Sequence, residues 1–464
     1  MARFIKAQCF VSPRATRVLN LSRTLITSLP NSVLQLRELR ALLLRDCYAL
    51  EMLPKLGAFH ELQVLDLCGT RIRELPEGFG RLTSLRKLNL SRTHHLENIK
   101  AGSISGLSSL EILDMSFSAF KWDVKRKVEL ERGVTFDELI TLERLSVLYI
   151  RLDSVDCLAL GCYLLRQLRQ FNIRISRRNC ESSYLPAPLD EKRVILRGVN
   201  LLERSLEGLL CPASALDLVT CRGINGLSDI VAKKSLNGLS NLKSLTISSC
   251  NCFVSLLDGD ISSRSTLPNL ERLTLSRLKN LKIMLERISP RGCLGRLKII
   301  EVVDCPRLNS LISFALLRLV PNLEEINASD CRRMTQLITY AIDCHVMLPK
   351  LRIIKLRNMA NLRSICAKAV AWQGLEIIEV SNCPELVKLP LLAYDALTIK
   401  EIRGDSKWWN SLRWENNIDR FILQQLFKEF SYSMMLAKED RWPDAEGMQT
   451  KGYLVGENFQ TSVP

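Results

Sequence analysis

Two neighbouring stretches decide the fold, LRALLLRDCYALEMLP (residues 39–54) and LQVLDLCGTRIRELP (residues 62–76). In both, leucine stands at the first, fourth and sixth places, a small polar residue stands at the ninth, and Leu-Pro closes the stretch. Because successive side chains of a strand point to opposite faces, the fourth and sixth places share one face. Each stretch therefore predicts a short strand with one buried face, followed by a turn.

This unit recurs along most of the chain. The N-terminal units begin 23 to 25 residues apart and the C-terminal units 24 to 28 residues apart, within the range of roughly 20–29 residues of a leucine-rich repeat. Since one unit cannot bury its apolar face alone, stacked units share a core. The sequence predicts an α/β leucine-rich repeat solenoid, with a curved parallel β-sheet on the concave face and loops and short helices on the convex face. The units begin at Thr16, Leu39, Leu62, Leu85 and Leu110, and again at Leu242, Leu270, Leu297, Leu323, Leu351 and Leu375.

The spacing and composition divide the chain into six expected segments. Residues 1–13 form an N-terminal edge and partial cap, 14–116 a regular repeat run, 117–240 an irregular middle, and 241–403 a second regular run. Residues 404–436 form a closing segment with a capping helix, and 437–464 a disordered tail. In the closing segment, Trp408, Trp409 and Trp414 are expected to cover the last coil. A helical apolar stripe is expected to help, and it consists of Ile418, Phe421, Ile422, Leu426 and Phe430.

Cysteines and histidines give no sign of a metal or redox site. Six of the 16 cysteines stand at the ninth place of a unit, where a small donor can satisfy a backbone carbonyl in the turn. The other cysteines form no C-x-x-C pair, and the four histidines lack metal-ligand spacing. Unpaired thiols indicate a reducing compartment, the cytoplasm or the nucleus. The six are Cys47, Cys221, Cys250, Cys305, Cys331 and Cys383.

The formal charge of +16 leaves two classes of partner open, nucleic acid and acidic protein surfaces. The sequence contains no zinc finger, no helix-turn-helix pattern and no aromatic-rich basic strand set, so an acidic protein surface is favoured. It also contains no phosphate-binding loop and no catalytic constellation. No apolar stretch approaches the roughly 18 residues that span a bilayer. We therefore expect a protein-binding module that is not an enzyme, has no cofactor or small-molecule substrate, and does not cross a membrane.

The outward strand places are the candidate binding surface. Their side chains line the concave sheet in order, so that a partner contacts several units at once. The alternative is a solvated face that only keeps the protein soluble. The candidates are Asp66, Lys87, Asn89, Arg92, Asp114, Tyr149, Arg151, Arg272, Arg277, Glu301, Glu325, Lys355, Arg357 and Glu379.

Several motifs together resemble one known family. TRVLNLSRT (residues 16–24) and LDLCGTRIRELP (residues 65–76) are similar to the leucine-rich repeats of plant coiled-coil nucleotide-binding disease-resistance proteins. The turns CPRL (residues 305–308) and CPELVKLP (residues 383–390) strengthen the resemblance, as does WWNSLRW (residues 408–414) at the end of the array. The resemblance extends over about residues 14–415.

The resemblance implies an intracellular immune receptor that detects pathogen effectors, directly or through a guarded host protein. In such receptors the repeats hold a nucleotide-binding core inactive, and basic N-terminal repeats face an acidic patch on that core. The coiled coil and the ATPase module do not occur in these 464 residues, so we expect a module that lacks its own nucleotide-binding core and meets one in trans. A stand-alone scaffold, a ubiquitin-ligase substrate adaptor and a nucleic-acid binder remain alternatives. The basic residues implied in the core contact are Arg14, Arg17, Arg23, Arg37, Arg40 and Arg45.

Overall fold

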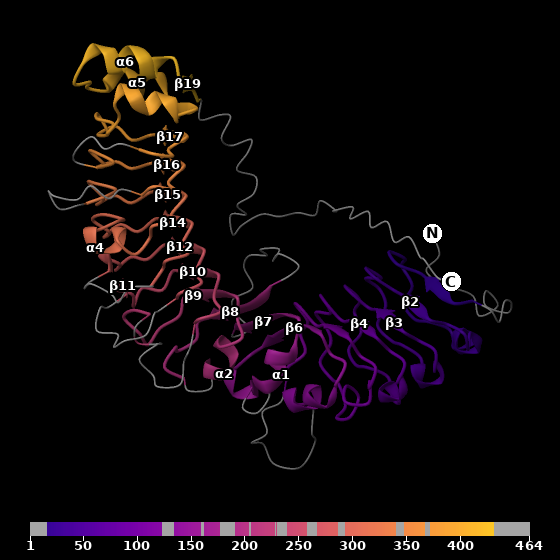
Figure 1. Ribbon diagram of the computed structural model, residues 1–464. Coiled ribbons are helices and arrows are strands. Elements are labelled where there is room, and N and C mark those ends of the chain that lie inside the picture. Colours follow the sequence, from indigo (N-terminus) through magenta and orange to yellow (C-terminus); the bar gives the residue numbers. More distant parts are fainter. Residues whose placement is uncertain are drawn as a thin grey trace.

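The protein forms a long curved solenoid, seen in a computed structural model (Figure 1). The structure describes residues 16–122, 134–158, 162–176, 191–203, 206–227, 229, 239–257, 267–285, 293–339, 348–366 and 372–430. Arg14 and the segments expected at residues 1–13 and 437–464 lie outside these ranges.

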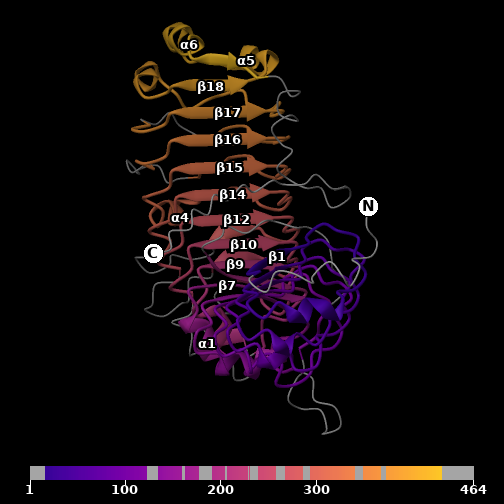
Figure 2. The same ribbon diagram turned by 90° about the vertical axis from the view of Figure 1, so that its right-hand side faces the viewer.

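One 17-stranded parallel sheet runs through the whole array and lines the inner side of the curve (Figure 1). Figure 2 shows its C-terminal strands stacked in one direction. The predicted leucine-rich repeat solenoid is therefore confirmed. In order along the sheet, the strands are β1 (Val18–Asn20), β2 (Ala41–Leu43), β3 (Val64–Asp66), β4 (Lys87–Asn89), β5 (Ile112–Asp114), β6 (Val147–Leu152), β7 (Gln170–Ser176), β8 (Lys192–Arg197), β9 (Ala215–Val219), β10 (Ser244–Ser248), β12 (Arg272–Ser276), β14 (Ile299–Val303), β15 (Glu325–Ser329), β16 (Ile353–Arg357), β17 (Ile377–Ser381), β18 (Glu401–Gly404) and β19 (Phe427–Glu429).

Alternation along each strand separates the core from the concave face. In β14, Ile300 and Val302 are fully buried, whereas Ile299 and Glu301 are partly exposed on the other face. Each inward residue stacks on its counterpart in the next coil, as Ile300 pairs with Ile326 of β15. Burying such a side chain stabilises the fold by roughly 1.5–3 kcal/mol, so each coil depends on its neighbours for most of its stability.

A residue with left-handed backbone conformation follows most strands and turns the ninth place of the unit inward. Arg23, Asp46 and Arg92 have φ of 62°, 57° and 55°, and the next residue in each case is Thr24, Cys47 or Thr93. Thr24 and Thr93 donate to the carbonyl oxygens three residues back, at 2.7 Å each. All six ninth-place cysteines are buried free thiols that donate to backbone carbonyls, which confirms their predicted role. Cys47 and Cys221 donate to a carbonyl of the preceding coil, and the other four donate to the carbonyl two residues back.

Short helical turns form the convex side (Figure 1). A small second parallel sheet of β11 (Ser255–Leu257) and β13 (Ile283–Leu285) lies among them. Among the described residues before the closing segment, the α-helices are α1 (Cys162–Gln167), α2 (Glu207–Leu210) and α4 (Phe314–Leu317). The described 3-10 turns are η2 (Asn31–Gln35), η3 (Leu56–Ala58), η4 (Phe79–Arg81), η5 (Phe136–Thr141), η6 (Val155–Leu158) and η8 (Ala393–Leu397).

The closing segment covers the last coils with tryptophan, as predicted, but only part of the expected apolar stripe, which includes Leu426, packs against the core. Trp408 and Trp409 lie in α5 (Ser406–Ser411) and are each 5% exposed. The next helix, α6 (Asn417–Gln424), buries Leu423 and Asp419 instead. Ile418 and Phe421 are 67% and 70% exposed. The expectation that these two side chains cover the coil is wrong, because the helix docks through its opposite face.

Candidate partner-binding surface

The concave face of the sheet presents the outward places of all its strands. Within the described residues, no helix lies over this face, since α1, α2 and α4 are on the outer side of the curve (Figure 1). The strand register places outward residues in columns that run along the solenoid. One such column joins Thr274, Glu301, Asn327, Lys355 and Glu379 across five neighbouring strands.

Three candidates in the first repeats hold the backbone where the strands end. Asp66 accepts a hydrogen bond from the backbone N–H of Cys68 at 3.0 Å. Asn89 and Asp114 likewise each accept a hydrogen bond from the backbone N–H of the residue two positions later. Burial raises the pKa of Asp114 above its ordinary value, although hydrogen bonds from Ser116 oppose the shift. These side chains contribute to local structure as well as to the surface.

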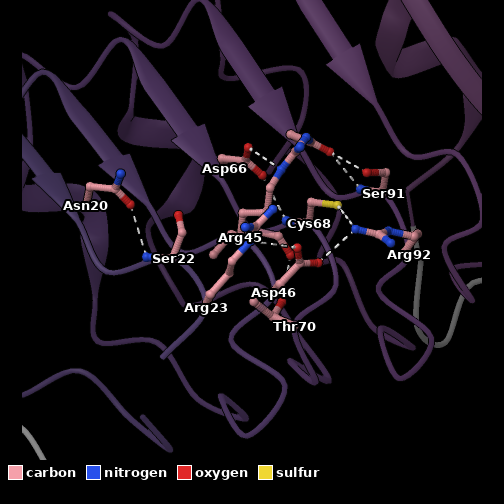
Figure 3. A network of polar contacts seen from close by, with 12 residues as sticks. Asn20, Ser22, Arg23, Arg45, Asp46, Asp66, Cys68, Thr70, Ser91 and Arg92 are labelled. Atoms are coloured by element: carbon pink, nitrogen blue, oxygen red, sulfur yellow. Dashed lines mark hydrogen bonds and ion pairs between the residues drawn. The ribbon is translucent and has the colours of Figure 1, made fainter. Parts of the chain in front are cut away.

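Two arginines and an aspartate form a second network beside these strands (Figure 3). Asp46 lies 2.8 Å from Arg92 and 3.9 Å from Arg23. Arg92 reaches Asp46 across the repeat that contains Gly69, where an added Cβ would lie 2.8 Å from the Asp46 carboxylate. The absence of a side chain at that position thus lets Arg92 bridge two repeats. Lys87, by contrast, is exposed.

The middle of the face contains a buried ion pair that sequence reasoning missed. Arg193 of β8 lies 2.6 Å from Asp217 of β9 and 2.8 Å from Glu191. Burial raises the pKa of Asp217, and Arg193 opposes that shift. The candidates Tyr149 and Arg151 lie two strands away on β6.

Ion pairs dominate the C-terminal part of the face. Lys355 lies 2.8 Å from Glu325, and Arg357 lies 2.9 Å from Glu379. Arg403, which was not predicted, lies 3.8 Å from Glu379 on its other side. These pairs join neighbouring coils, so the charges stabilise the stacking and neutralise one another.

The remaining C-terminal candidates differ in exposure. Burial raises the pKa of Glu301, which accepts a hydrogen bond from Thr274 at 3.3 Å. Arg272 and Arg277 are exposed, and Arg277 donates to Ser248 at 3.4 Å. All the C-terminal candidates lie on β12–β17 or directly after β12, so the structure brings this part of the set together.

The basic residues of the first repeats do not form one patch. Arg17 and Arg40 precede β1 and β2, where the Arg40 N–H donates to the Arg17 carbonyl at 2.7 Å. Arg23 and Arg45 follow the same two strands at their other ends, and Arg37 follows η2. The structure therefore places the described members of the set before and after the first two strands rather than at one end of them.

A row of alternating charges runs along the N-terminal ends of the C-terminal strands, and the sequence analysis did not predict it. It occupies the place before each strand, and the backbone N–H of each member donates to the carbonyl of the preceding member. Glu376 lies 2.7 Å from both Arg352 and Lys400. Only a comparison of this place across repeats would have detected the row, which consists of Lys243, Glu271, Lys298, Glu324, Arg352, Glu376 and Lys400.

Glu376, near the C-terminal end of this row, is expected to make an acid-dependent contribution to stability. Hydrogen bonds from Arg352 and Lys400 lower the pKa of Glu376 from 4.5 to about 2. Because the pKa is lower in the folded state, the contribution is complete above the ordinary pKa and is lost as the pH falls toward 2. We expect Glu376→Gln to lower the urea midpoint slightly at pH 7, as for other exposed ion pairs. The difference from wild type should vanish near pH 2; a difference independent of pH would contradict this account.

The described residues show neither a metal site nor a membrane helix. Within those ranges, no three His, Cys, Asp or Glu side chains are grouped closely enough to hold a metal ion. Nor does any helix in the described part of the chain combine the length and apolar character that crossing a membrane requires.

The parallel sheet and its open concave face place this protein in the class of leucine-rich repeat proteins. A leucine-rich repeat protein of Leptospira interrogans has the same fold, with a TM-score of 0.50 at 17% identity over 92% of this chain and 98% of that one. The family described as leucine-rich repeat region matches residues 10–197. The family of leucine-rich repeats like those of the plant disease resistance protein RPS2 matches residues 209–332 and 285–392.

Curated relatives agree with these matches. The disease resistance protein At4g27190 of Arabidopsis thaliana is 38% identical over 89% of this chain and 42% of its own length. The probable disease resistance protein At4g27220 of the same plant is 36% identical over 80% of this chain and 46% of its own. The chain belongs to the family of leucine-rich repeat regions found in plant disease resistance proteins. It spans less than half the length of these relatives.

Proposed function

We propose that the chain is the protein-binding module of an intracellular plant immune receptor. Its concave face recognises a pathogen effector or a guarded host protein, and the module acts without catalysis. Regulation of a nucleotide-binding core, within the same chain or in trans, is part of this proposal, as is a location in the cytoplasm or nucleus. Leucine-rich repeat solenoids commonly bind proteins along their extended concave surfaces.

One observation supports the proposal most directly. The outward side chains of β12 and β14–β18 form a continuous field in register over six strands, and all of them except the buried Glu379 are at least partly exposed. No described helix covers this field (Figure 1). A partner placed there contacts several repeats at once, and its specificity depends on the order of charges along the coil.

Exchange of an ion pair tests the proposal without removing the pair. Glu325→Lys combined with Lys355→Glu keeps opposite charges 2.8 Å apart but reverses their order on the concave face. We expect the double variant to fold normally and to bind its partner about tenfold more weakly or worse, about 1.4 kcal/mol. The measurement is quantitative co-purification of the tagged chain from pathogen-challenged leaf tissue.

A matched exchange away from this face serves as the control. Lys388 and Glu415 form an exposed pair at 2.6 Å outside the strands of the large sheet. Lys388→Glu with Glu415→Lys should leave the set of recovered partners unchanged. If both exchanges remove the same partners, or neither removes any, the concave face is not the recognition surface.

A further inference from the structure

Three isoleucines of the concave face lie in one column of the strand register. Ile299 of β14 pairs with Glu325, Glu325 with Ile353 of β16, and Ile353 with Ile377 of β17. All three isoleucines are partly exposed, whereas the inward residues beside them are buried. We call Ile299, Ile353 and Ile377 the isoleucine stripe.

Glu325, which stands between Ile299 and Ile353 in this column, directs its carboxylate toward the neighbouring column. A carboxylate oxygen of Glu325 accepts hydrogen bonds from Lys355 at 2.8 Å and from Asn327 at 3.1 Å, both in the next column. The stem of Glu325 therefore remains between Ile299 and Ile353, while its charge lies to one side. The stripe thus presents an aliphatic surface across four strands.

The charges around the stripe are balanced. The outward places of β12–β18 hold equal numbers of cations and anions, and most of these form ion pairs with one another. A partner gains little net Coulomb attraction from such a surface, so apolar contact supplies most of the affinity, while the order of the charges selects which partner fits. The cations are Arg272, Lys355, Arg357 and Arg403, and the anions are Glu301, Glu325, Glu379 and Glu401.

The spacing of the stripe distinguishes between helix and extended chain. With strands about 4.8 Å apart, Ile353 lies about 10 Å and Ile377 about 15 Å along the column from Ile299. Residues i, i+7 and i+11 of a helix share one face and are spaced by about 10.5 and 16.5 Å. An extended segment places side chains on one face about every 6.7 Å, which misses the 10 Å position.

We propose that the isoleucine stripe binds an amphipathic helix of the protein partner, which lies across the strands with aliphatic residues at i, i+7 and i+11. This inference rests on the proposed function and specifies the chemistry of its partner. It follows the general mode in which an apolar helix face docks into a hydrophobic surface. The charged residues on either side align the helix, and the stripe supplies the affinity.

A displayed library of helical peptides tests the proposal on the full chain. Peptides of about 20 residues, roughly 30 Å long when helical, are randomised along one face and selected for binding. We expect aliphatic residues to be selected at i, i+7 and i+11. Affinity of the selected peptide should stay within about twofold between 0.1 M and 1 M salt, where the screening length falls from about 10 Å to about 3 Å. Ile353→Lys should weaken binding about tenfold or more, with an unchanged circular dichroism spectrum.

Ile283→Lys is the control, because Ile283 is an exposed isoleucine of the second sheet, away from the stripe. It should leave affinity unchanged. The proposal would be overturned if charged residues were selected or if affinity fell steeply with salt. It would also be overturned if binding survived Ile353→Lys, or if the library yielded no more binders on the wild-type chain than on the Ile353→Lys chain. Co-purification from pathogen-challenged tissue distinguishes a failure of the isoleucine stripe from a failure of the proposed function. If the Glu325 and Lys355 exchange removes a partner that Ile353→Lys retains, the concave face binds partners but not through the stripe.

Discussion

Replacing Trp408 by alanine is expected to lower the free energy of unfolding by about 3–5 kcal/mol, the usual cost of truncating a buried aromatic residue. Trp408 is 5% exposed, and its indole N–H donates to the Leu386 carbonyl at 2.9 Å. It also contacts Trp409, which stacks on Phe427 of the last strand. Truncation leaves a cavity and an unpaired carbonyl at the end of the array.

Because coils depend on their neighbours, the loss should appear first in the C-terminal repeats. Hydrogen exchange should accelerate at β17 and β18 before β2 and β3, and urea denaturation gives the total change. Phe421→Ala is the control within the same cap, since Phe421 is 70% exposed and its truncation should cost less than about 0.5 kcal/mol. Equal effects of the two variants would show that the tryptophans do not close the array.

Gly106→Ala is expected to have the second large effect, about 3 kcal/mol. On the convex side of the first repeats the backbone of one coil lies directly against the next. A Cβ on Gly106 would lie 2.3 Å from the carbonyl oxygen of Gly80, and one on Gly80 would lie 2.7 Å from that of Gly102. Backbone atoms cannot rotate away as a side chain can, so the coils must separate, at the upper end of the usual cost of overpacking.

The matched control for this change is Gly374→Ala. The nearest atom to a Cβ at Gly374 is the carbonyl oxygen of Pro349 at 3.3 Å, a contact that a small shift relieves. Thermal unfolding should show a clear drop in midpoint for Gly106→Ala and a much smaller one for Gly374→Ala. A Gly106→Ala chain as stable as wild type would mean that the convex coils are less tightly packed than the structure shows.

The sequence predicted the fold because the repeat depends on buried residues. Leucine at the first, fourth and sixth places fixes which side of each strand faces the core, as Leu297, Ile300 and Val302 show by being fully buried. The same register explained cysteines such as Cys331 as turn donors rather than ligands. Such inferences succeed because one place in the unit has the same environment in every coil.

The surface could be predicted only in part, because an outward side chain is shaped by residues one repeat away. Asp66 faces outward as predicted but bonds the backbone of Cys68, and Glu325 is turned aside by Lys355. Nothing in the spacing of leucines reveals these contacts. Phe421 faces outward for a different reason: α6 carries apolar residues on more than one side, and the side with Leu423 packs inward.

Photo-crosslinking in pathogen-challenged tissue tests the central claim most directly. A benzophenone side chain replaces either Lys355, on the concave face of β16, or Lys388, which lies outside the large sheet. If the concave face recognises the partner, a specific protein adduct forms from position 355 and not from position 388. Adducts that form only from position 388, or equally from both positions, would contradict recognition by the concave face.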